Sequence, residues 1–230
     1  MRQNWDFKSI AFNCLLTVVL IILLAPLLIV FISSFLDKAH LSWPFNDFTF
    51  RWYLEVFKRD IWVKALMNSL IVAGLTTLFT LILCTPAAYA VTRRTNRFTE
   101  FLRTFFMSPI MIPPVMIGIS LLIFLSNFGI RGSYLDLALG HTLWAGPIVF
   151  ITMIAVFERF NPIYAYAAQD LGANSLEIFW QITLPMVKPG LIASIFLSFV
   201  LSTQEFIIGL FLYSLFNNTA TTEIYTAIRY

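Results

Sequence analysis

The residue best suited to chemistry in this sequence is Glu205, which stands in an otherwise apolar stretch from Pro189 to Leu212. Its helical face is shared by small residues, because these recur every three or four positions: Ser194, Ser198, Ser202 and Gly209. At about 1.5 Å per residue, Glu205 would lie roughly two-thirds of the way across a bilayer core about 30 Å thick. A carboxylate at that depth is costly and should face a cavity or a partner.

Two interpretations of Glu205 are open. It could be a carboxylate on a solute pathway, where a cation would meet it, or a hydrogen-bonded strut that pairs with an arginine or a backbone amide of a neighbouring helix. The candidates for a solute pathway are this acid, its polar neighbours and two prolines of another apolar run: Glu205, Gln204, Ser202, Ser198, Pro113 and Pro114.

The other reactive side chains are less informative. His141 falls near the outer end of its apolar run, so we expect an interfacial residue rather than a proton carrier. Cys14 and Cys84 lie in apolar runs without the spacing of metal ligands, and we expect buried, reduced thiols. GxxxxGK[ST], HExxH, CxxC and GxSxG motifs are absent from the sequence, which predicts no catalytic site, no bound cofactor and no metal site.

The composition is that of a membrane protein. Hydrophobic residues make up 59% of the chain and charged residues 12%, whereas soluble domains have about 45–50% and about 25%. The formal net charge of +3 is too small to indicate a nucleic-acid partner. The positive-inside rule places the densest basic loop in the cytoplasm, with Arg93, Arg94, Arg97 and Arg103.

Five apolar runs are long enough to cross a bilayer as helices, at about residues 9–35, 68–91, 105–125, 137–157 and 189–212. Arg2 and Lys8 before the first run favour a cytoplasmic N-terminus. That run is too long for the apolar part of a signal peptide, so we interpret it as a retained span. Residues 36–64 mix aromatic and charged side chains, which indicates an amphipathic helix at the outer membrane face or a solvated loop with aromatic anchors.

Small residues and prolines distinguish the second and third predicted spans. The second carries small residues at helical spacing, which let membrane helices approach closely: Ala73, Thr77, Thr80, Cys84 and Ala88. The third contains Pro109, Pro113, Pro114 and Gly118. So many helix breakers are tolerated at membrane depth only where neighbours or a water-filled cavity satisfy the freed backbone groups. We therefore expect the third span to border a pathway.

A polar stretch, YAAQDLGANSLEIFWQITLP, runs from Tyr166 to Pro185 between two of the apolar runs. Its composition favours a helix from Ala165 to Leu171, which Gly172 ends. Asn174 is a suitable N-cap for a second helix, with Glu177 at the third helical position as in a capping box. The stretch predicts a helix-turn-helix that lies across a membrane surface.

This stretch resembles the EAA loop of ABC importer permeases, in which Glu-Ala-Ala, three residues, Gly, nine residues and Ile-x-Leu-Pro form the element that docks into the ATPase subunit. The matching positions are Ala167, Ala168, Gly172, Ile182, Leu184 and Pro185. The leading Glu is replaced by Tyr166, so the contribution of that carboxylate is missing or supplied elsewhere. The resemblance implies that a cytoplasmic loop at residues 158–188 couples to an ATPase through these positions and their neighbours Tyr166, Asp170, Asn174 and Ser175.

Within this family, the chain looks like the spermidine/putrescine type over most of its length. The similarity is carried by FTFRWYLEVF, by the prolines from Ser108 to Gly118, by AAQDLGA and by LSFVLSTQEF. Members often have one or two acids where Gln204 and Glu205 stand, and one of the two is Gln here. Permeases for iron, thiamine, phosphonates or opines share the loop and a nearby acid, so these solutes are alternatives to a polyamine.

The resemblance implies a fold and a set of partners. The fold would be an all-α polytopic membrane protein, a type I permease-like bundle forming one domain over residues 1–230, with five spans present and the family's sixth missing. Its coupling helix would lie between spans four and five. The partners would be a second, homologous permease in a heterodimer, an ABC ATPase dimer that holds ATP and Mg, an extracytoplasmic solute-binding protein and the lipid of a bacterial inner membrane.

A self-contained secondary transporter or channel is the alternative from a different class. It would show inverted repeats with two interrupted helices in matching positions. Only the third span is interrupted in this sequence, and it has no clear counterpart.

Overall fold

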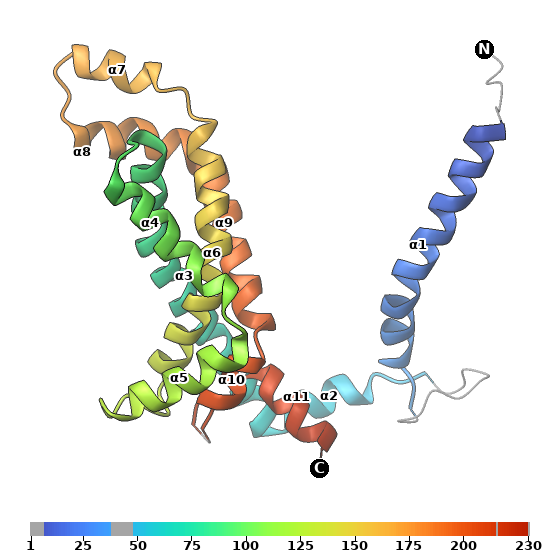
Figure 1. Cartoon of the computed structure of the whole chain (residues 1–230). Coiled ribbons are helices and arrows are strands. Elements are labelled where there is room, and N and C mark those ends of the chain that lie inside the picture. Colours follow the sequence, from blue (N-terminus) through green and yellow to red (C-terminus); the bar gives the residue numbers. More distant parts are fainter. Residues whose placement is uncertain (1–6, 38–47, 215, 230) are drawn as a thin grey trace. The chain divides into compact units, whose positions relative to one another are not determined.

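The computed structural model describes residues 7–37, 48–214 and 216–229, and it falls into two compact units, residues 1–63 and 64–230. The described elements are helices (Figure 1): α1 (Phe7–Ser33), α2 (Arg51–Lys58), α3 (Asp60–Arg93), α4 (Arg97–Met107), the 3-10 turn η1 (Ser108–Met111), α5 (Pro114–Ser126), α6 (Tyr134–Glu158), α7 (Ile163–Asp170), α8 (Ser175–Ile178), the π-helical turn η2 (Phe179–Thr183), α9 (Leu184–Gln204), α10 (Ile207–Leu212) and α11 (Ala220–Arg229).

The first unit contains α1, α2 and the first residues of α3. The apolar side chains of α1 are exposed along the helix, as expected where a helix faces lipid. Cys14 is among these exposed residues, so the expectation of a buried thiol is wrong there and right for Cys84. The helix α2 confirms helical structure within residues 36–64, and Trp52 Nε1 ties it to the carbonyl of Leu36 at 2.7 Å. Residues 38–47 of that segment lie outside the described residues.

The second unit is a bundle of α3, α4, α6 and α9 with shorter helices at its ends (Figure 1). Small residues let the long helices approach closely. At the crossing of α9 with α6, a Cβ on Gly190 would lie 2.3 Å from Cγ2 of Val156. The predicted stripe on α3 is buried in this bundle, which confirms its role as a packing face: Ala73, Thr77, Thr80, Cys84 and Ala88.

Two apolar clusters form the core of the bundle. One joins α3, α6 and α9 and is centred on Phe150, Met153 and Phe157. The other joins α3, α5, α6 and α10 and is centred on Leu137 and Ile208. The buried polar residues His141 and Glu205 lie next to this second cluster, near Gly209.

Four helical stretches are long and apolar enough to cross a membrane, and a bent pair can be counted as a fifth. The bent pair corrects the third predicted span, residues 105–125, which is not one helix. The first arm, Arg97–Met111, meets the second, Pro114–Ser126, at 104°. The prolines explain the break, since Pro109 falls in η1 and Pro113 and Pro114 lie where α5 begins.

The fifth predicted span, residues 189–212, is also different in the structure. Helical backbone begins earlier, at Ser175, and runs through η2 and α9 to Gln204, a stretch of 30 residues. It then stops, because Glu205 has extended backbone, with φ −68° and ψ 125°. The short helix α10 follows after this break. Glu205 and Gly209 therefore do not continue the helical face of Ser194, Ser198 and Ser202 as the sequence spacing indicated.

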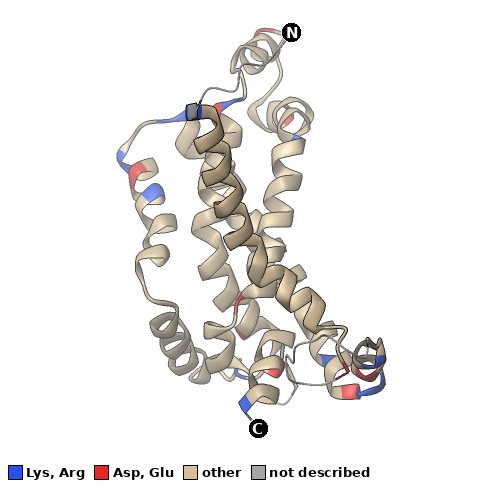
Figure 2. Ribbon diagram, turned by 90° about the vertical axis from the view of Figure 1, so that its right-hand side faces the viewer, with Lys and Arg blue, Asp and Glu red and all other residues tan. Residues whose placement is uncertain are grey.

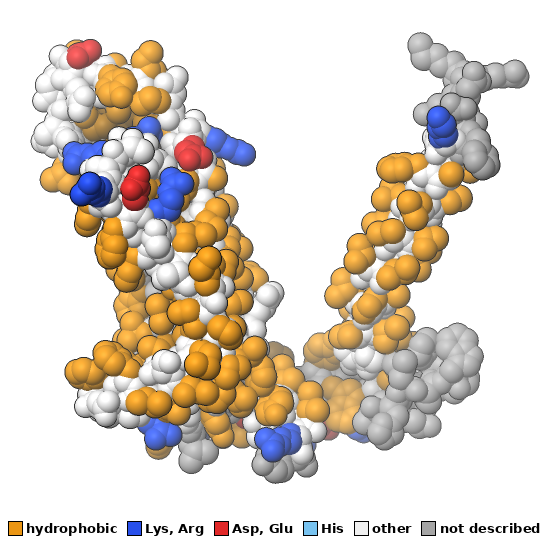
Figure 3. All heavy atoms as spheres, viewed as in Figure 1, with side chains coloured by type: hydrophobic (Ala, Val, Ile, Leu, Met, Phe, Trp, Pro, Cys, Tyr) orange, Lys and Arg blue, Asp and Glu red, His pale blue; other side chains and the backbone are white. Residues whose placement is uncertain are grey.

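The two ends of the bundle differ. The helices α7 and α8 lie at one end, and α5, α10 and α11 lie at the other (Figure 1). Most charged residues lie near the ends of the long helices, with long uncharged stretches between them (Figure 2). In the view of Figure 3, apolar side chains cover the length of the bundle, and charged ones gather next to α7 and α8. This distribution is the one expected of a bundle that crosses a membrane.

Candidate functional site

The segment from α7 to α8, which we call the hairpin, is built as the sequence predicts. Gly172 has φ +90°, a conformation that L-residues with a side chain rarely adopt. Its N–H donates to the carbonyl of Gln169 at 2.8 Å, and the N–H of Ala173 donates to the carbonyl of Ala168 at 3.0 Å. These two bonds form the Schellman motif that ends α7.

The second helix of the hairpin begins with a complete capping box. The side chain of Asn174 accepts hydrogen bonds from the N–H groups of Leu176 and Glu177, both at 3.0 Å. Oε2 of Glu177 accepts in return from the N–H of Asn174 at 2.8 Å. The short α8 then continues through η2 into α9, so the hairpin is rigidly joined to a long helix of the bundle.

The hairpin and the turn η2 beside it expose large apolar side chains, from 51% to 90% of each: Ile163, Tyr164, Tyr166, Leu171 and Leu176 of the hairpin and Trp180 of η2. Most of the predicted coupling residues are exposed with them: Tyr166, Ala167, Asp170, Gly172, Asn174, Ser175 and Pro185. Ala168 is buried, and Ile182 and Leu184 are half-buried. Exposed apolar side chains rimmed by polar ones are typical of a surface that binds another protein.

The end of the bundle that carries the hairpin is also its basic end. The cations come from the end of α3 and the loop after it, from α4, from the residue after α6 and from the start of α9: Arg93, Arg94, Arg97, Arg103, Arg159 and Lys188. Basic residues concentrate on the cytoplasmic side of membrane proteins. The hairpin and the basic residues therefore indicate the same side of the membrane.

At the opposite end, Glu205 is buried at the break between α9 and α10, with 6% of the residue exposed. Its two carboxylate oxygens accept hydrogen bonds from the N–H of Ile208 at 2.8 Å and the N–H of Gly209 at 2.9 Å. The carboxylate thus caps the N-terminus of α10, where a negative charge is favoured. This placement is the one that the strut interpretation requires.

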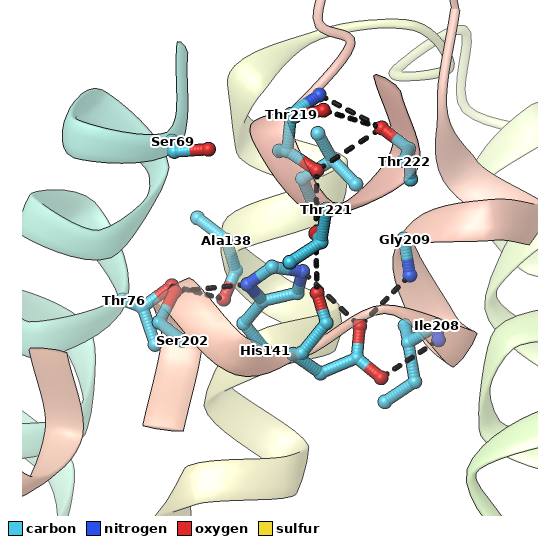
Figure 4. Close-up of polar contacts among 12 residues, drawn as sticks. Ser69, Thr76, Ala138, His141, Ser202, Ile208, Gly209, Thr219, Thr221 and Thr222 are labelled. Atoms are coloured by element: carbon cyan, nitrogen blue, oxygen red, sulfur yellow. Dashed lines mark hydrogen bonds and ion pairs between the residues drawn. The ribbon is translucent and has the colours of Figure 1, made fainter. Parts of the chain in front are cut away.

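A polar network surrounds this cap (Figure 4). His141 Nδ1 lies 2.9 Å from Ser202 Oγ, and His141 Nε2 lies 3.4 Å from Oε2 of Glu205. Ser202 donates in turn to Oγ1 of Thr76 at 3.3 Å, and Oγ1 of Thr221 donates to the carbonyl of Glu205 at 3.0 Å. The network joins α3, α6, α9 and α11. His141 is only 1% exposed, so the prediction of an interfacial residue is wrong.

The structure separates the six candidates for a solute pathway. Ser198 and Ser202 are buried with Glu205 inside the bundle, whereas Gln204 and Pro113 are exposed and Pro114 is half-buried. Contact of any of them with a solute stays a prediction. Among the described residues, no group of three or more His, Cys, Asp or Glu side chains could hold a metal ion.

Sequence reasoning missed two residues beside the hairpin, Tyr89 and Arg93, at the end of α3. The positive-inside rule accounts for Arg93 by orientation alone, yet its Nη2 donates to the carbonyls of Phe157 and Phe160, at 3.3 Å and 3.5 Å. The available signal was the spacing of four residues, which places an aromatic ring and a guanidinium on one helical face.

The chain matches the family model described as binding-protein-dependent transport system inner membrane component over residues 81–228. The spermidine/putrescine transport system permease protein PotC of Escherichia coli (strain K12) is 26% identical over 214 residues, which cover 93% of this chain and 81% of that protein. The putrescine transport system permease protein PotI of the same strain is 30% identical over 228 aligned residues, which cover 90% and 76%.

A solved structure has the same fold. It is the crystal structure of a bacterial ABC transporter involved in the import of the acidic polysaccharide alginate, and one of its chains has a TM-score of 0.81 to this chain. The identity is 19%, and the match covers 99% of this chain and 82% of that one. The fold is therefore that of an ABC transporter permease.

Proposed function

The chain belongs to the family of binding-protein-dependent transport system inner membrane components, and we propose that it carries a polyamine such as spermidine or putrescine across a bacterial inner membrane while a partner ATPase hydrolyses ATP. The polyamine is supported by the two permeases PotC and PotI, to which the chain is similar along most of its length. The fold itself does not select the solute, because a chain of an alginate importer shares it.

In this proposal the hairpin is the contact with the ATPase and lies in the cytoplasm, as does the N-terminus. The observation that carries this part is the exposure of apolar side chains on a segment that is rigidly capped and joined to α9. A rigid, exposed segment can take up a displacement of a partner and pass it to the bundle. ATP and Mg then belong to the partner ATPase dimer.

The remaining partners are a second, homologous permease and an extracytoplasmic solute-binding protein. The apolar flanks of the bundle, shown in Figure 3, fit lipid and a neighbouring permease alike. The six candidate residues for a solute pathway belong to the proposal as residues to test, and Gln204 and Pro113 are the exposed ones among them. Iron, thiamine, phosphonates and opines are the alternative solutes.

The contact with the ATPase is tested by Gly172→Arg in the complete complex. The site has space for a side chain, but a residue with a Cβ at φ +90° is strained by about 1–2 kcal/mol, which would distort the turn between α7 and α8. We expect normal membrane insertion with loss of solute-stimulated ATP hydrolysis and of ATPase co-purification.

A matched control is Gly129→Arg. Gly129 also has a positive φ, +69°, and open space around it, but it lies between α5 and α6 at the other end of the bundle. This variant should retain the ATPase on purification. Unchanged ATPase retention and hydrolysis in the Gly172 variant would contradict the proposed contact.

The solute is tested by uptake of radiolabelled spermidine and putrescine into proteoliposomes that contain the complete complex and its binding protein. We expect uptake that requires ATP on the side of the ATPase. Uptake of thiamine, iron or a phosphonate, with none of the polyamines, would reassign the solute and leave the permease function in place.

A further inference from the structure

The last turn of α3 contacts the chain where it enters the hairpin. Arg93 is half-buried, and its guanidinium donates to the carbonyls of Phe157 and Phe160 at the end of α6. It also lies over the ring of Phe160, 5.0 Å from the ring centroid. Phe160 in turn contacts Tyr164 of α7, with ring centroids 6.5 Å apart. Arg93 therefore contacts the entry of the hairpin, the residues through which α6 leads into α7.

The same turn of α3 contacts the chain where it leaves the hairpin. The ring of Tyr89 packs edge-on against Phe179, the first residue of η2, with centroids 5.2 Å apart. It packs equally against Phe157, at 5.3 Å, and the guanidinium of Arg93 lies 5.6 Å from the centroid of Tyr89. Tyr89 thus joins the exit of the hairpin to its entrance and to Arg93.

We propose that Tyr89 and Arg93 form an anchor through which α3 holds both the entry and the exit of the hairpin. When the ATPase displaces the hairpin, this anchor passes the displacement to α3. The proposal rests on the proposed coupling to an ATPase. Tyr89 and Arg93 are positioning residues in this proposal, because they act on the entry and exit of the hairpin and not directly on the ATPase or the solute.

The helix α3 is suited to carry such a displacement across the bundle. It runs for 34 residues, about 50 Å at 1.5 Å per residue, from the hairpin end to the opposite end. At the middle of α3 Thr76 accepts a hydrogen bond from Ser202, and nearer the opposite end Asn68 donates to the carbonyls of Phe216 and Asn218. The anchor and this polar network therefore lie on one continuous helix.

The chemistry of the anchor favours arginine over lysine. A guanidinium presents several N–H donors in a planar fork and stacks on aromatic rings, whereas an ammonium is a compact point charge. Arg93→Lys keeps the charge that orients the loop but loses the fork and the stacking. Arg93→Gln loses the charge as well.

The test uses the complete complex in proteoliposomes and measures the solute moved per ATP hydrolysed. The variants are Arg93→Lys, Arg93→Gln and Tyr89→Leu, and the matched control is Arg94→Gln, which removes the same charge from an exposed neighbour just beyond α3. We expect the solute moved per ATP to fall roughly 5-fold or more in Arg93→Gln and Tyr89→Leu, in the range of typical coupling between sites. Arg93→Lys should be intermediate, and the control should match the wild type.

Normal complex yield and an unchanged KM for ATP should accompany that loss, because a purely structural defect would lower the yield instead. If the complex with Arg93→Gln does not assemble, the ratio of solute to ATP in Arg93→Lys and Tyr89→Leu tests the anchor. A wild-type ratio of solute to ATP in the assembled variants overturns the anchor while the proposed function stands. Absence of solute-stimulated hydrolysis in the wild-type complex overturns the proposed function itself.

Discussion

Glu205 uses both carboxylate oxygens on the backbone of the helix that follows it. At the residue scale this explains how an acid is accommodated among apolar helices, since two N–H groups and the N-terminus of α10 compensate its charge. The sequence indicated an unusual acid but not the break beside it. The helical spacing continued through Gly209, whereas in the structure α9 ends where Glu205 takes an extended backbone and its carboxylate accepts from the N–H groups of Ile208 and Gly209.

Replacement of this acid by Gln separates the two interpretations. In Glu205→Gln one oxygen becomes an amide nitrogen, which cannot accept the second N–H. Hydrogen bonds to a charged group contribute about 1.5–3 kcal/mol, so the break between α9 and α10 should be weakened. If Glu205 is a strut, we expect assembled complex and polyamine uptake to fall together, measured as yield and as uptake per complex. A loss of uptake much larger than the loss of assembly would instead indicate contact with the solute.

His141 illustrates a limit of reasoning from position along the chain. Its place near the end of a span suggested the membrane surface, but His141 is buried beside Ser202 of α9 and Glu205. Burial by a segment some sixty residues away has no local signal in the sequence. Arg93 shows the same limit, because its partners are carbonyls of α6.

At the scale of elements, the hairpin is the part that the sequence predicted most fully. Its signals are local: Gly172 at a positive φ ends one helix, and Asn174 with Glu177 begins the next. The bend of 104° between α4 and α5 was less accessible. The prolines locate a break, but α5 packs against α10 in the bend, for example where Gly118 approaches Phe211, and this long-range contact has no local signal in the sequence.

The capping box provides a prediction for the hairpin. Asn174→Ala removes the acceptor of the Leu176 and Glu177 N–H groups, and the loss of an N-cap costs about 1 kcal/mol. We expect faster amide hydrogen exchange at residues 175–179, by roughly 5-fold for 1 kcal/mol, with little change in the bundle. Gln169→Ala, at an exposed position of α7, is the control. Equal amide exchange rates at residues 175–179 in the two variants would mean that the Asn174 cap does not stabilise α8.

The contact of α9 with α6 provides a second prediction at this scale. A side chain at Gly190 would collide with the branched Val156, whose Cγ2 would lie 2.3 Å from a new Cβ. Overpacking of this kind typically costs about 1–3 kcal/mol, so Gly190→Val should lower the monodisperse fraction in detergent after heating. Gly74→Val is the matched control, since a Cβ there meets nothing within 4 Å. Equal heat resistance of the two variants would contradict the observed packing.

At the scale of the whole molecule, composition and span length were enough to predict a polytopic helical protein, and the loop motif was enough to predict its family. The solute was not accessible in the same way. Three of the six predicted pathway residues, Ser198, Ser202 and Glu205, are buried inside the bundle, whereas the other three are exposed or half-buried, so the six do not mark one surface. Hydrophobic periodicity specifies which faces are buried but not which chain or solute covers the remaining faces.

Orientation in the membrane is the last property that can be tested at this scale. The hairpin and most basic residues of the bundle lie at one end, which the positive-inside rule assigns to the cytoplasm. Ser175 of α8 and Gly129 beyond α5 are exposed at opposite ends. In a background with Cys14→Ser and Cys84→Ala, Ser175→Cys should react with a membrane-impermeant maleimide only in opened cells or inside-out vesicles. Gly129→Cys should react in intact spheroplasts. The reverse pattern would place the hairpin outside the cell, where no ATPase could reach it, and would remove the basis of the coupling proposal.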